Sequence, residues 1–283
     1  MIYIVIPVFN RWHYTKDCLF SLQTQTYKKF KIIVVDHGST DGTSKNINAE
    51  FPEVIVLKGD QSMWWAAATN VGVKYALASN ADYLLTLNND LVVNSDYLKN
   101  IIDATIHNTK AIIGSLSADK KDYNRIVFTG TKWNKWTAKY RPSVEILNLP
   151  NYCKANKFIK SDLLPGRGTL IPVKAFKDVG LFDDENFPHY AADEYFSFIC
   201  RKSGYDLIIP TNVIVYSEVE ATGLKNERYS RNLTLWKEMF TSIRSPLNLK
   251  YRWIWAVKCS PLPPIYFFID LCRIIFSQIK IIR

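Results

Sequence analysis

The sequence lacks the features that mark fibrous, disordered or membrane-spanning chains. Its 283 residues include only 11 Gly and 12 Pro, with 48% hydrophobic and 22% charged residues, which excludes collagen-like, repetitive and disordered proteins. No run of about 18 uncharged apolar residues occurs, so we expect no ordinary spanning helix. The start, MIYIVIPVFN, has neither a basic lead nor a long apolar run, and we interpret it as a strand rather than a signal peptide. The length predicts about two domains, or one large α/β domain with an appendage.

The cysteines and histidines are too few and too far apart in the sequence to indicate a disulfide set or a zinc site. The five cysteines are far apart with no CxxC pair, and the four histidines form no HExxH pair. An odd number of separated cysteines disfavours a zinc site or a disulfide set and is typical of a reducing compartment. We therefore expect a cytoplasmic protein.

Positive charge is concentrated at one end of the chain. The net charge is +10, and the segment from residue 225 onward holds 11 Lys and Arg against 3 Asp and Glu. A nucleic-acid enzyme would more often spread its basic residues along a groove, so we expect no nucleic-acid partner. A basic tail interleaved with aromatic residues instead indicates an anionic membrane surface.

The first half of the sequence alternates apolar strands with helices. We predict strands at 2–8, 31–36, 53–57 and 83–87, and helices at 15–25, up to 50, and at 66–79. Strands that are apolar on both faces predict a mainly parallel sheet covered by helices on both sides. Ligands bind beyond the carboxyl ends of such strands. Three polar clusters follow strands in this way, at residues 10–11, 36–41 and 88–90.

The second half predicts fewer elements. A strand is expected at 125–129, a helix at 192–202 and a late strand at 208–216. The middle of the chain, with its lysines and tryptophans, is expected to pack beside the sheet and to shape an acceptor site.

The cluster after the second strand suits a nucleotide. Asp36 could accept an N–H from a nucleobase edge, while the small residues of the turn GSTDGT let the backbone approach phosphate. An ordinary capped turn, with Ser39, Thr40 or Asp41 as N-cap, is the alternative.

The run Asn88-Asn89-Asp90 follows an apolar strand and suits a hard cation. A carboxylate at this position could hold a divalent ion that carries a diphosphate. A polar turn is the alternative, because Asn and Asp are common turn residues.

Three further positions could carry chemistry. Asp193, at a predicted helix start, could take a proton from a hydroxyl; the alternative is a helix-dipole acid, a role that Glu194 fits better. Arg167, between two glycines, suits an anion, although a surface arginine is the commoner case. The adjacent Trp64 and Trp65 cannot both enter one helical core face, so one of them could line a sugar or base site.

Six motifs in order carry a family resemblance: VIPVFNR, VVDHGSTDGT, ATNVGVKYAL, LLTLNND, GRGTLIPVKAFKDVGLFDD and HYAADEYFSF…KSGY. Over residues 2–217 the set resembles the inverting family-two glycosyltransferases of GT-A fold, and most of all the bacterial surface-polysaccharide enzymes that include rhamnosyltransferases. The resemblance implies an α/β, Rossmann-like sheet with helices on both faces and a basic amphipathic helical extension. The implied catalytic domain is 1–222, with a nucleotide-sugar half at about 1–115 and an acceptor half at about 116–222; residues 223–283 form the extension.

The resemblance also implies site residues. The donor site would comprise Pro7, Phe9, Asn10, Arg11, Asp36, Ser39, Asp41, Trp65, Asn70, Asn88, Asn89 and Arg167. Asp90 would hold Mg²⁺ or Mn²⁺ against the diphosphate, and Asp193 would be the general base. His189 and Trp64 are candidates for the acceptor site. The family pattern is altered where Asn88 replaces the first acid of the metal motif, Ala192 replaces the companion acid of the base, and Ser217 stands where relatives place a histidine.

The implied reaction moves a sugar from dTDP-rhamnose or a UDP-hexose to a hydroxyl of a glycan acceptor, which we expect to be lipid-linked. The implied setting is bacterial surface-polysaccharide synthesis. A sugar nucleotidyltransferase is one alternative, but it usually needs a glycine-rich basic loop that Pro7–Arg11 lacks. A catalytically weak nucleotide-sugar-binding homologue is another, against which the retained Asp90 and Asp193 argue.

The last residues, 261–283, form a predicted helix with one narrow polar stripe made of Asp270, Arg273, Ser277 and Lys280. These charges favour a helix lying in the membrane interface over one that spans it. Basic and aromatic residues before it would face lipid headgroups: Arg244, Lys250, Tyr251, Arg252, Trp253, Trp255 and Lys258. We therefore expect a peripheral protein on the inner face of the cell membrane. Packing on the catalytic domain or on a twin subunit, as a homodimer, is the alternative.

Overall fold

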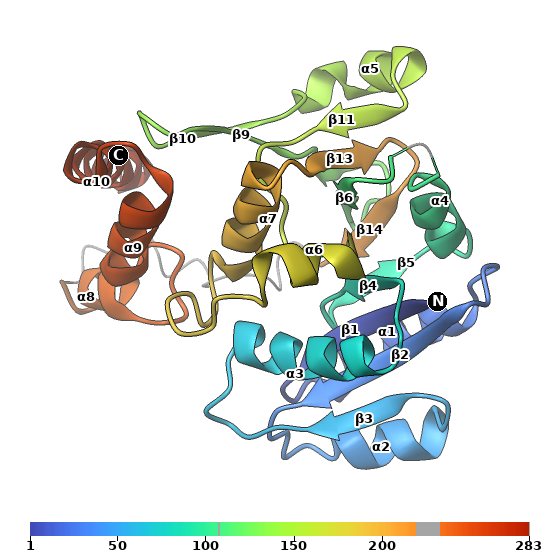
Figure 1. Cartoon of the computed structure of the whole chain (residues 1–283). Coiled ribbons are helices and arrows are strands. Elements are labelled where there is room, and N and C mark those ends of the chain that lie inside the picture. Colours follow the sequence, from blue (N-terminus) through green and yellow to red (C-terminus); the bar gives the residue numbers. More distant parts are fainter. Residues whose placement is uncertain (107, 219–232, 283) are drawn as a thin grey trace.

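The centre of the molecule is a mixed sheet whose strands come from most of the chain (Figure 1). The computed structural model describes residues 1–106, 108–218 and 233–282. In sheet order the strands are β11 (Phe158–Lys160), β13 (Asp206–Pro210), β6 (Ala111–Ile113), β12 (Thr169–Pro172), β4 (Tyr83–Thr86), β1 (Ile2–Val8), β2 (Phe30–Asp36) and β3 (Ile55–Lys58). The pairs β1–β2, β1–β4, β2–β3 and β6–β13 are parallel, whereas β11 and β12 run antiparallel to their neighbours.

Helices cover both faces of this sheet, as predicted. They are α1 (Trp12–Gln23), α2 (Thr43–Glu50), α3 (Trp65–Ala78), α4 (Tyr97–Asp103), α5 (Leu149–Ala155), α6 (Val173–Val179) and α7 (Ala192–Lys202). Successive residues of a strand point to opposite sides. In β1, Ile4 and Ile6 join a core with residues of α1, α2 and α4, whereas Tyr3 and Val5 join a second core with residues of α3, α6 and α7. Every residue of β1 is buried.

A smaller sheet has the order β5 (Leu91–Val93), β14 (Ile214–Ser217), β7 (Leu116–Asp119) and β8 (Ile126–Phe128), and β9 (Thr131–Asn134) pairs with β10 (Lys139–Pro142). The prediction of one late strand at 208–216 was wrong, because β13 and β14 belong to different sheets. Pro210 ends β13, and its carbonyl accepts a 3.2 Å turn hydrogen bond from the N–H of Val213. Proline has no N–H to continue a ladder, which favours a break at this position.

Helix α1 begins earlier than predicted, at Trp12, and no side chain caps its start. Arg11 occupies the N-cap position without a side-chain cap, and Asn10 instead accepts a hydrogen bond from the N–H of Thr40 at 2.8 Å. The polar residue after β1 therefore ties two loops together rather than starting the helix.

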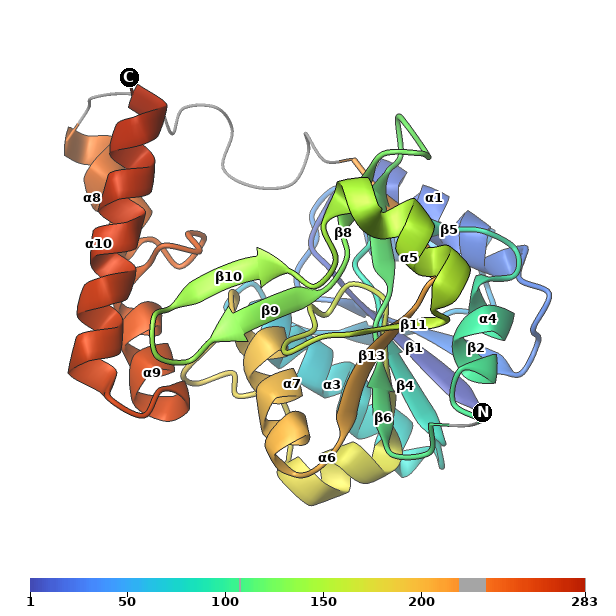
Figure 2. The same ribbon diagram turned by 90° about the horizontal axis from the view of Figure 1, so that it is seen from above.

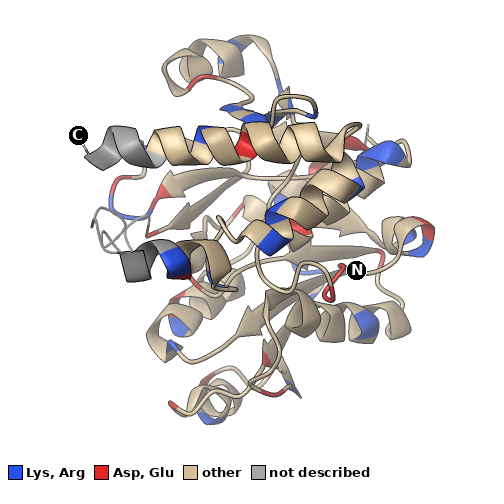
Figure 3. Cartoon of the chain, turned by 90° about the vertical axis from the view of Figure 1, so that its left-hand side faces the viewer, with Lys and Arg blue, Asp and Glu red and all other residues tan. Residues whose placement is uncertain are grey.

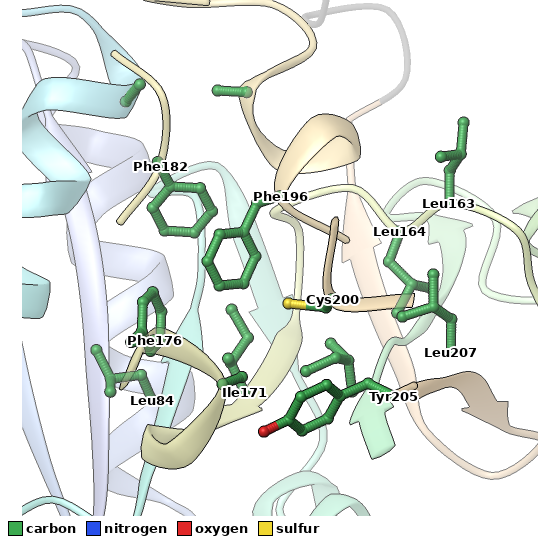
Figure 4. Packing of buried hydrophobic residues seen from close by; sticks show 14 of the residues in the cluster. Leu84, Leu163, Leu164, Ile171, Phe176, Phe182, Phe196, Cys200, Tyr205 and Leu207 are labelled. Carbon is green, nitrogen blue, oxygen red and sulfur yellow. The ribbon is translucent and has the colours of Figure 1, made fainter. Parts of the chain in front are cut away.

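Aromatic packing fixes the start of α7 against the sheet (Figure 4). The ring of Phe196 lies 4.9 Å from that of Phe176 and 4.6 Å from that of Phe182, measured between centroids. All three rings are buried beside Leu84 and Ile171. Burial of each such ring contributes roughly 1.5–3 kcal/mol, so the first turn of α7 has a firm base.

Three further helices, α8 (Leu233–Thr241), α9 (Leu249–Cys259) and α10 (Pro263–Ile282), stand beside the α/β body (Figures 1 and 2). Trp255 is 5% exposed and its ring packs against Trp133 of the β9–β10 hairpin, with centroids 5.5 Å apart. Trp133 also donates a 3.0 Å hydrogen bond from Nε1 to the hydroxyl of Tyr266. One side of α9 and α10 is therefore part of the main core. The predicted boundary between the catalytic domain and the extension, at residue 222, lies outside the described residues.

One residue of the predicted polar stripe of α10, Asp270, faces the protein, whereas Ser277 of the same stripe is exposed. Asp270 is 2% exposed and pairs with Arg252 of α9 and with Arg273, at 2.9 Å for the latter. A buried carboxylate needs such partners, since an unpaired charge in the interior costs several kcal/mol, on the order of 3–5. In the part of the chain that the model describes, no helix combines the length and the apolar character that a membrane crossing requires.

Candidate functional site

The carboxyl ends of β1, β2 and β4 bring the three predicted polar clusters together. The N–H of Asn10 donates to Ser39 Oγ at 2.7 Å, which joins the loop after β1 to the loop after β2. The rings of Phe9 and His37 are stacked at 5.4 Å. Asn88 follows β4 at the same edge. Because these strands are parallel and adjacent, their loops meet at one edge, where ligands bind in sheets of this kind.

Asp36 closes β2 and retains hydrogen-bonding capacity. Its Oδ1 accepts from the N–H of Ser39 at 2.8 Å, and its Oδ2 accepts from the hydroxyl of Ser44. Each carboxylate oxygen can accept two hydrogen bonds, so both oxygens can receive a further donor such as a base N–H. The side chain is 5% exposed, at the end of a buried strand.

Asp41 serves the turn itself. Its carboxylate accepts the N–H groups of Trp12 and Thr43, both at 3.1 Å, at the first residues of α1 and α2. Burial tends to raise the pKa of Asp41, but these hydrogen bonds outweigh burial and lower it. The N-cap of α2 is Gly42, so Asp41 ties the turn to both helix starts from one residue before the N-cap and is not itself the cap of the alternative named above.

Backbone strain marks the loop after β1. Asn10 and Arg11 have φ of 57° and 63°, in the left-handed region that non-glycine residues seldom adopt. Such conformations cost roughly 1–3 kcal/mol and persist where the surroundings hold them, frequently at ligand sites. Pro7 is buried within β1 and Phe9, after it, is 40% exposed, so only the second of these can meet a ligand directly.

Trp65, Gly166 and Asp193 meet at the start of α7. The N–H of Gly166 donates to Asp193 Oδ2 at 2.6 Å, and the N–H of Glu194 donates to Oδ1 at 2.9 Å. A Cβ on Gly166 would lie 2.4 Å from the Trp65 ring, so only glycine permits this approach. Trp65 in turn donates from Nε1 to Asn88 Oδ1 at 3.0 Å. Both oxygens of Asp193 are thus oriented by backbone groups.

The two acids at the start of α7 are weaker acids than usual. Burial raises the pKa of Asp193, and the hydrogen bonds from Gly166 and Glu194 and the charge of Arg167 oppose it only in part. Burial and the neighbouring Asp193 raise the pKa of Glu194 to about 7. A carboxylate with a raised pKa is a better base near neutral pH.

Asp90 is the one acid of the predicted metal motif, and its geometry fits a cation. Its Oδ1 is buried without a hydrogen-bond partner. Burial raises the pKa of Asp90, while the charges of Arg167 and Arg11 lower it. An unpartnered carboxylate oxygen suits a divalent ion shared with a diphosphate, which would supply most of the ligands and whose negative charge would offset the two guanidinium groups. No group of three His, Cys, Asp or Glu that could hold a metal occurs within the described residues.

Glu218 is a second acid near Asp90 that the sequence did not single out. Strand β14 pairs with β5 so that Ser217 lies opposite Leu91, which brings the following Glu218 toward Asp90. The charge of Glu218 contributes to the raised pKa of Asp90. The sequence alone could not show that Glu218 lies near Asp90, because their proximity depends on the pairing of two strands more than 120 residues apart.

Asn70 and Asn89 support the site from inside. Asn70 is 4% exposed, and its side-chain amide exchanges two hydrogen bonds with the backbone of Phe182, at 2.8 and 3.1 Å. Asn89 donates to Thr15 Oγ1 at 3.0 Å. These amides hold loops and helices in place, and the donor contact expected for them stays a prediction.

Trp64 points to a different set of residues from Trp65. Its ring lies 5.5 Å from that of His189, and the guanidinium of Arg244 lies 5.6 Å above it. Burial, Arg244 and His37 lower the pKa of His189 to about 4, so its ring is neutral at physiological pH. Arg244, predicted above to face lipid headgroups, instead lies at the candidate site.

Comparison with known proteins gives a family match and several distant relatives. Residues 3–166 match the family model described as glycosyl transferase family 2. An uncharacterized glycosyltransferase of Rickettsia typhi is 29% identical over 213 residues, which cover 72% of this chain and 60% of that protein. A UDP-N-acetylglucosamine–dolichyl-phosphate N-acetylglucosaminyltransferase of Methanococcus voltae is 28% identical over 145 residues, which cover 46% of this chain and 57% of that protein. The chain thus spans less than two thirds of the length of these relatives.

Solved structures share the fold. GalNAc-T7, crystallised with UDP, GalNAc and Mn²⁺, aligns with a TM-score of 0.63 at 13% identity over 98% of this chain and 57% of its own. The mannosyltransferase PcManGT of Pyrobaculum calidifontis, in complex with GDP-Man and Mn²⁺, aligns with a TM-score of 0.60 at 15% identity over 99% and 71%. At these identities the likeness establishes the fold alone.

Proposed function

Since the chain belongs to glycosyl transferase family 2 and has the GT-A fold, we propose that it transfers a sugar, with inversion, from a nucleoside-diphosphate sugar to a glycan hydroxyl. The observation that carries the proposal is the orientation of Asp193, whose carboxylate accepts the N–H of Gly166 at 2.6 Å beside the Trp65 ring. An oriented carboxylate of raised pKa next to loops suited to a nucleotide is what a general base for hydroxyl attack requires.

The proposed reaction is a single displacement. Asp193 takes the proton of the acceptor hydroxyl while that oxygen bonds to the anomeric carbon, and the bond from this carbon to the diphosphate oxygen breaks on the opposite face. The leaving nucleoside diphosphate carries the electron pair away. Arg11 and Arg167 lie where they can stabilise its charge, and Asp90 would hold Mg²⁺ or Mn²⁺. When bound, such a cation supplies further charge stabilisation to the diphosphate.

The proposed donor is dTDP-rhamnose, with UDP-hexoses second, and the proposed setting is bacterial surface-polysaccharide synthesis on a lipid-linked acceptor. The residues that support a pyrimidine are Asp36, with free acceptor capacity, and the Phe9–His37 stack. The motif resemblance to rhamnosyltransferases supports the sugar.

A thermal-shift panel of nucleotide sugars, with and without Mn²⁺, tests this function. We expect stabilisation by a dTDP- or UDP-sugar, strengthened by Mn²⁺ and lost in Asp36→Ala; Asp96→Asn, an exposed acid elsewhere, is the control. Slow release of nucleoside diphosphate from the stabilising donor would support a transferase. Release of pyrophosphate would favour the nucleotidyltransferase alternative, and an absence of any stabilisation would contradict the proposal.

We also propose that α10 rests on an anionic membrane. Ile265, Phe268 and Phe276 are 55%, 66% and 65% exposed, and their spacing puts them on one side of α10, opposite the buried Asp270. Few charged residues occur along the described part of this helix (Figure 3). A helix with an outward apolar side and a buried, paired carboxylate on its other side can insert the apolar side among lipids. The headgroup contacts would come from fewer cations than predicted, since Arg252 pairs with Asp270 and Lys258 pairs with Asp183 at 3.2 Å. Lys250 stays exposed.

Vesicle sedimentation tests this docking. The double variant Phe268→Asp/Phe276→Asp should lose binding to phosphatidylglycerol vesicles, whereas Phe20→Asp, an equally exposed residue of α1, should bind like the wild type. If the wild type ignores vesicles but forms a dimer that the double variant breaks, a second copy covers α10 and the membrane proposal is rejected.

A further inference from the structure

The turn between α8 and α9 is built as a rigid support. The side chain of Asn248, 5% exposed, donates to the carbonyls of Thr241 and Ser242 at 2.7 and 3.0 Å and caps α9. Ser245, 1% exposed, donates from its hydroxyl to the carbonyl of Met239. Buried polar groups that are fully bonded specify one local conformation. Arg244, between the anchored Ser242 and Ser245, is therefore presented by a fixed backbone.

The side chain of Arg244 is exposed, and no ion pair among the described residues includes it. Its guanidinium lies over the Trp64 ring at 5.6 Å, and the described residues offer it no carboxylate within ion-pair distance. Its neighbours differ in this respect, since Arg252 and Lys258 of α9 both pair with acids. An arginine stacked on an aromatic ring keeps its donor edge available for an oxyanion.

His189 adds a second unsatisfied group at the same place. Its Nδ1 is buried without a hydrogen-bond partner, and its ring lies 5.5 Å from Trp64. The ring is neutral because burial and Arg244 lower its pKa, so it can donate a hydrogen bond to a phosphate or sugar oxygen without a further charge. His189 is four residues before Asp193, which connects this place to the proposed base.

The donor diphosphate has its own cations. Arg167 and Arg11 are the charges that act on Asp90, whereas Arg244 acts on His189. The two adjacent tryptophans also contact different residues. Trp65 donates a hydrogen bond to Asn88, whereas the ring of Trp64 packs against that of His189. The cation over Trp64 is thus a different one from the two that act on Asp90.

We propose that Arg244, with Trp64 and His189, binds a phosphate group carried by the acceptor, next to the sugar whose hydroxyl Asp193 deprotonates. This inference rests on the proposed transferase function and adds the chemical class of the acceptor. Bidentate donation from a guanidinium to a phosphate gives orientation as well as affinity, so the phosphate would set which hydroxyl reaches Asp193.

Binding of two matched soluble probes tests the proposal. The probes are an alkyl glycosyl phosphate and the alkyl glycoside of the same sugar, titrated by calorimetry into the full chain saturated with nucleoside diphosphate and Mn²⁺. We expect the phosphate probe to bind at least about tenfold more tightly than the neutral one, and Arg244→Gln to abolish that preference. Arg244→Lys should retain part of it, and Lys250→Gln, an exposed cation of α9, should retain all of it.

Other outcomes would overturn the proposal. If Arg244→Gln weakens both probes equally and lowers the melting temperature, the contact with Trp64 is only structural. If it instead reduces binding to phosphatidylglycerol vesicles and leaves the probes unaffected, the phosphate that Arg244 meets is a lipid headgroup. Nucleoside-diphosphate binding tests the proposed transferase function separately, and Arg244→Gln should bind the nucleotide as the wild type does. If neither protein binds the nucleotide, the transferase function itself is contradicted.

Discussion

The backbone N–H of Gly166 donates a 2.6 Å hydrogen bond to the carboxylate of Asp193, and this contact joins the loop before β12 to the first turn of α7. It fixes one oxygen of the acid, while the N–H of Glu194 fixes the other at 2.9 Å. The side chain is thereby held in one orientation, which the proposed role of Asp193 as a general base requires.

Asp193→Asn should remove transfer and keep nucleotide binding. An amide of the same shape fills the space but cannot take a proton, so kcat should fall by about 10²–10⁴-fold or more, the usual contribution of a general base. Nucleoside-diphosphate affinity, measured by calorimetry, should change less than about threefold, since the loops after β1 and β2 are untouched. Normal turnover by this variant would show that another group is the base.

Gly166→Ala should lower turnover through geometry. The added Cβ would lie 2.4 and 2.6 Å from Trp65 ring atoms and 3.4 Å from Cβ of Asp193. The ring or the loop must then move, and a displacement of about 1 Å at a catalytic group can cost about 10²-fold in rate. We expect kcat to fall by roughly 10- to 100-fold, with nucleoside-diphosphate affinity retained. A lower melting temperature with unchanged kcat would mean that the contact matters for stability only.

Much of the framework was accessible from the sequence, because apolar runs and turn residues determine local structure. Helix 192–202 and strand 2–8 were predicted with the bounds that the structure has. The convergence of the loops near Asn10, Asp36 and Asn88 followed from parallel pairing. What could not be predicted depends on contacts between distant segments: the pairing of buried Asp270 with Arg252, the position of Arg244 over Trp64, and Glu218 beside Asp90.

Glu194→Gln should stabilise the protein in alkaline solution. Burial and Asp193 raise the pKa of Glu194 from 4.5 to about 7, so the folded state keeps a proton that the unfolded state has lost. Wild-type stability therefore falls as pH rises from about 4.5 to about 7 and then levels off. The glutamine has no charge to bury, so its unfolding free energy should exceed that of the wild type by up to about 3 kcal/mol at pH 8 and by little at pH 4.5.

Urea unfolding between pH 4.5 and pH 8 measures this difference, with the exposed Glu185→Gln as control. The control should follow the wild type at every pH. A constant difference between Glu194→Gln and wild type across the range would contradict the raised pKa.

Asp90 and Glu218 should act together on a divalent cation. Asp90 has a buried oxygen without a partner, and Glu218 is close enough to raise its pKa. In Asp90→Asn, Mn²⁺ affinity in the presence of nucleoside diphosphate should fall by at least about tenfold, and Glu218→Gln should cause a smaller loss, since each removes one negative charge from the site. Electron paramagnetic resonance of free Mn²⁺ measures both, independently of turnover. Asp96→Asn, an exposed acid after β5, should match the wild type. Equal Mn²⁺ affinity in all four proteins would mean that the diphosphate alone holds the ion and that the Asp90 oxygen stays buried for another reason.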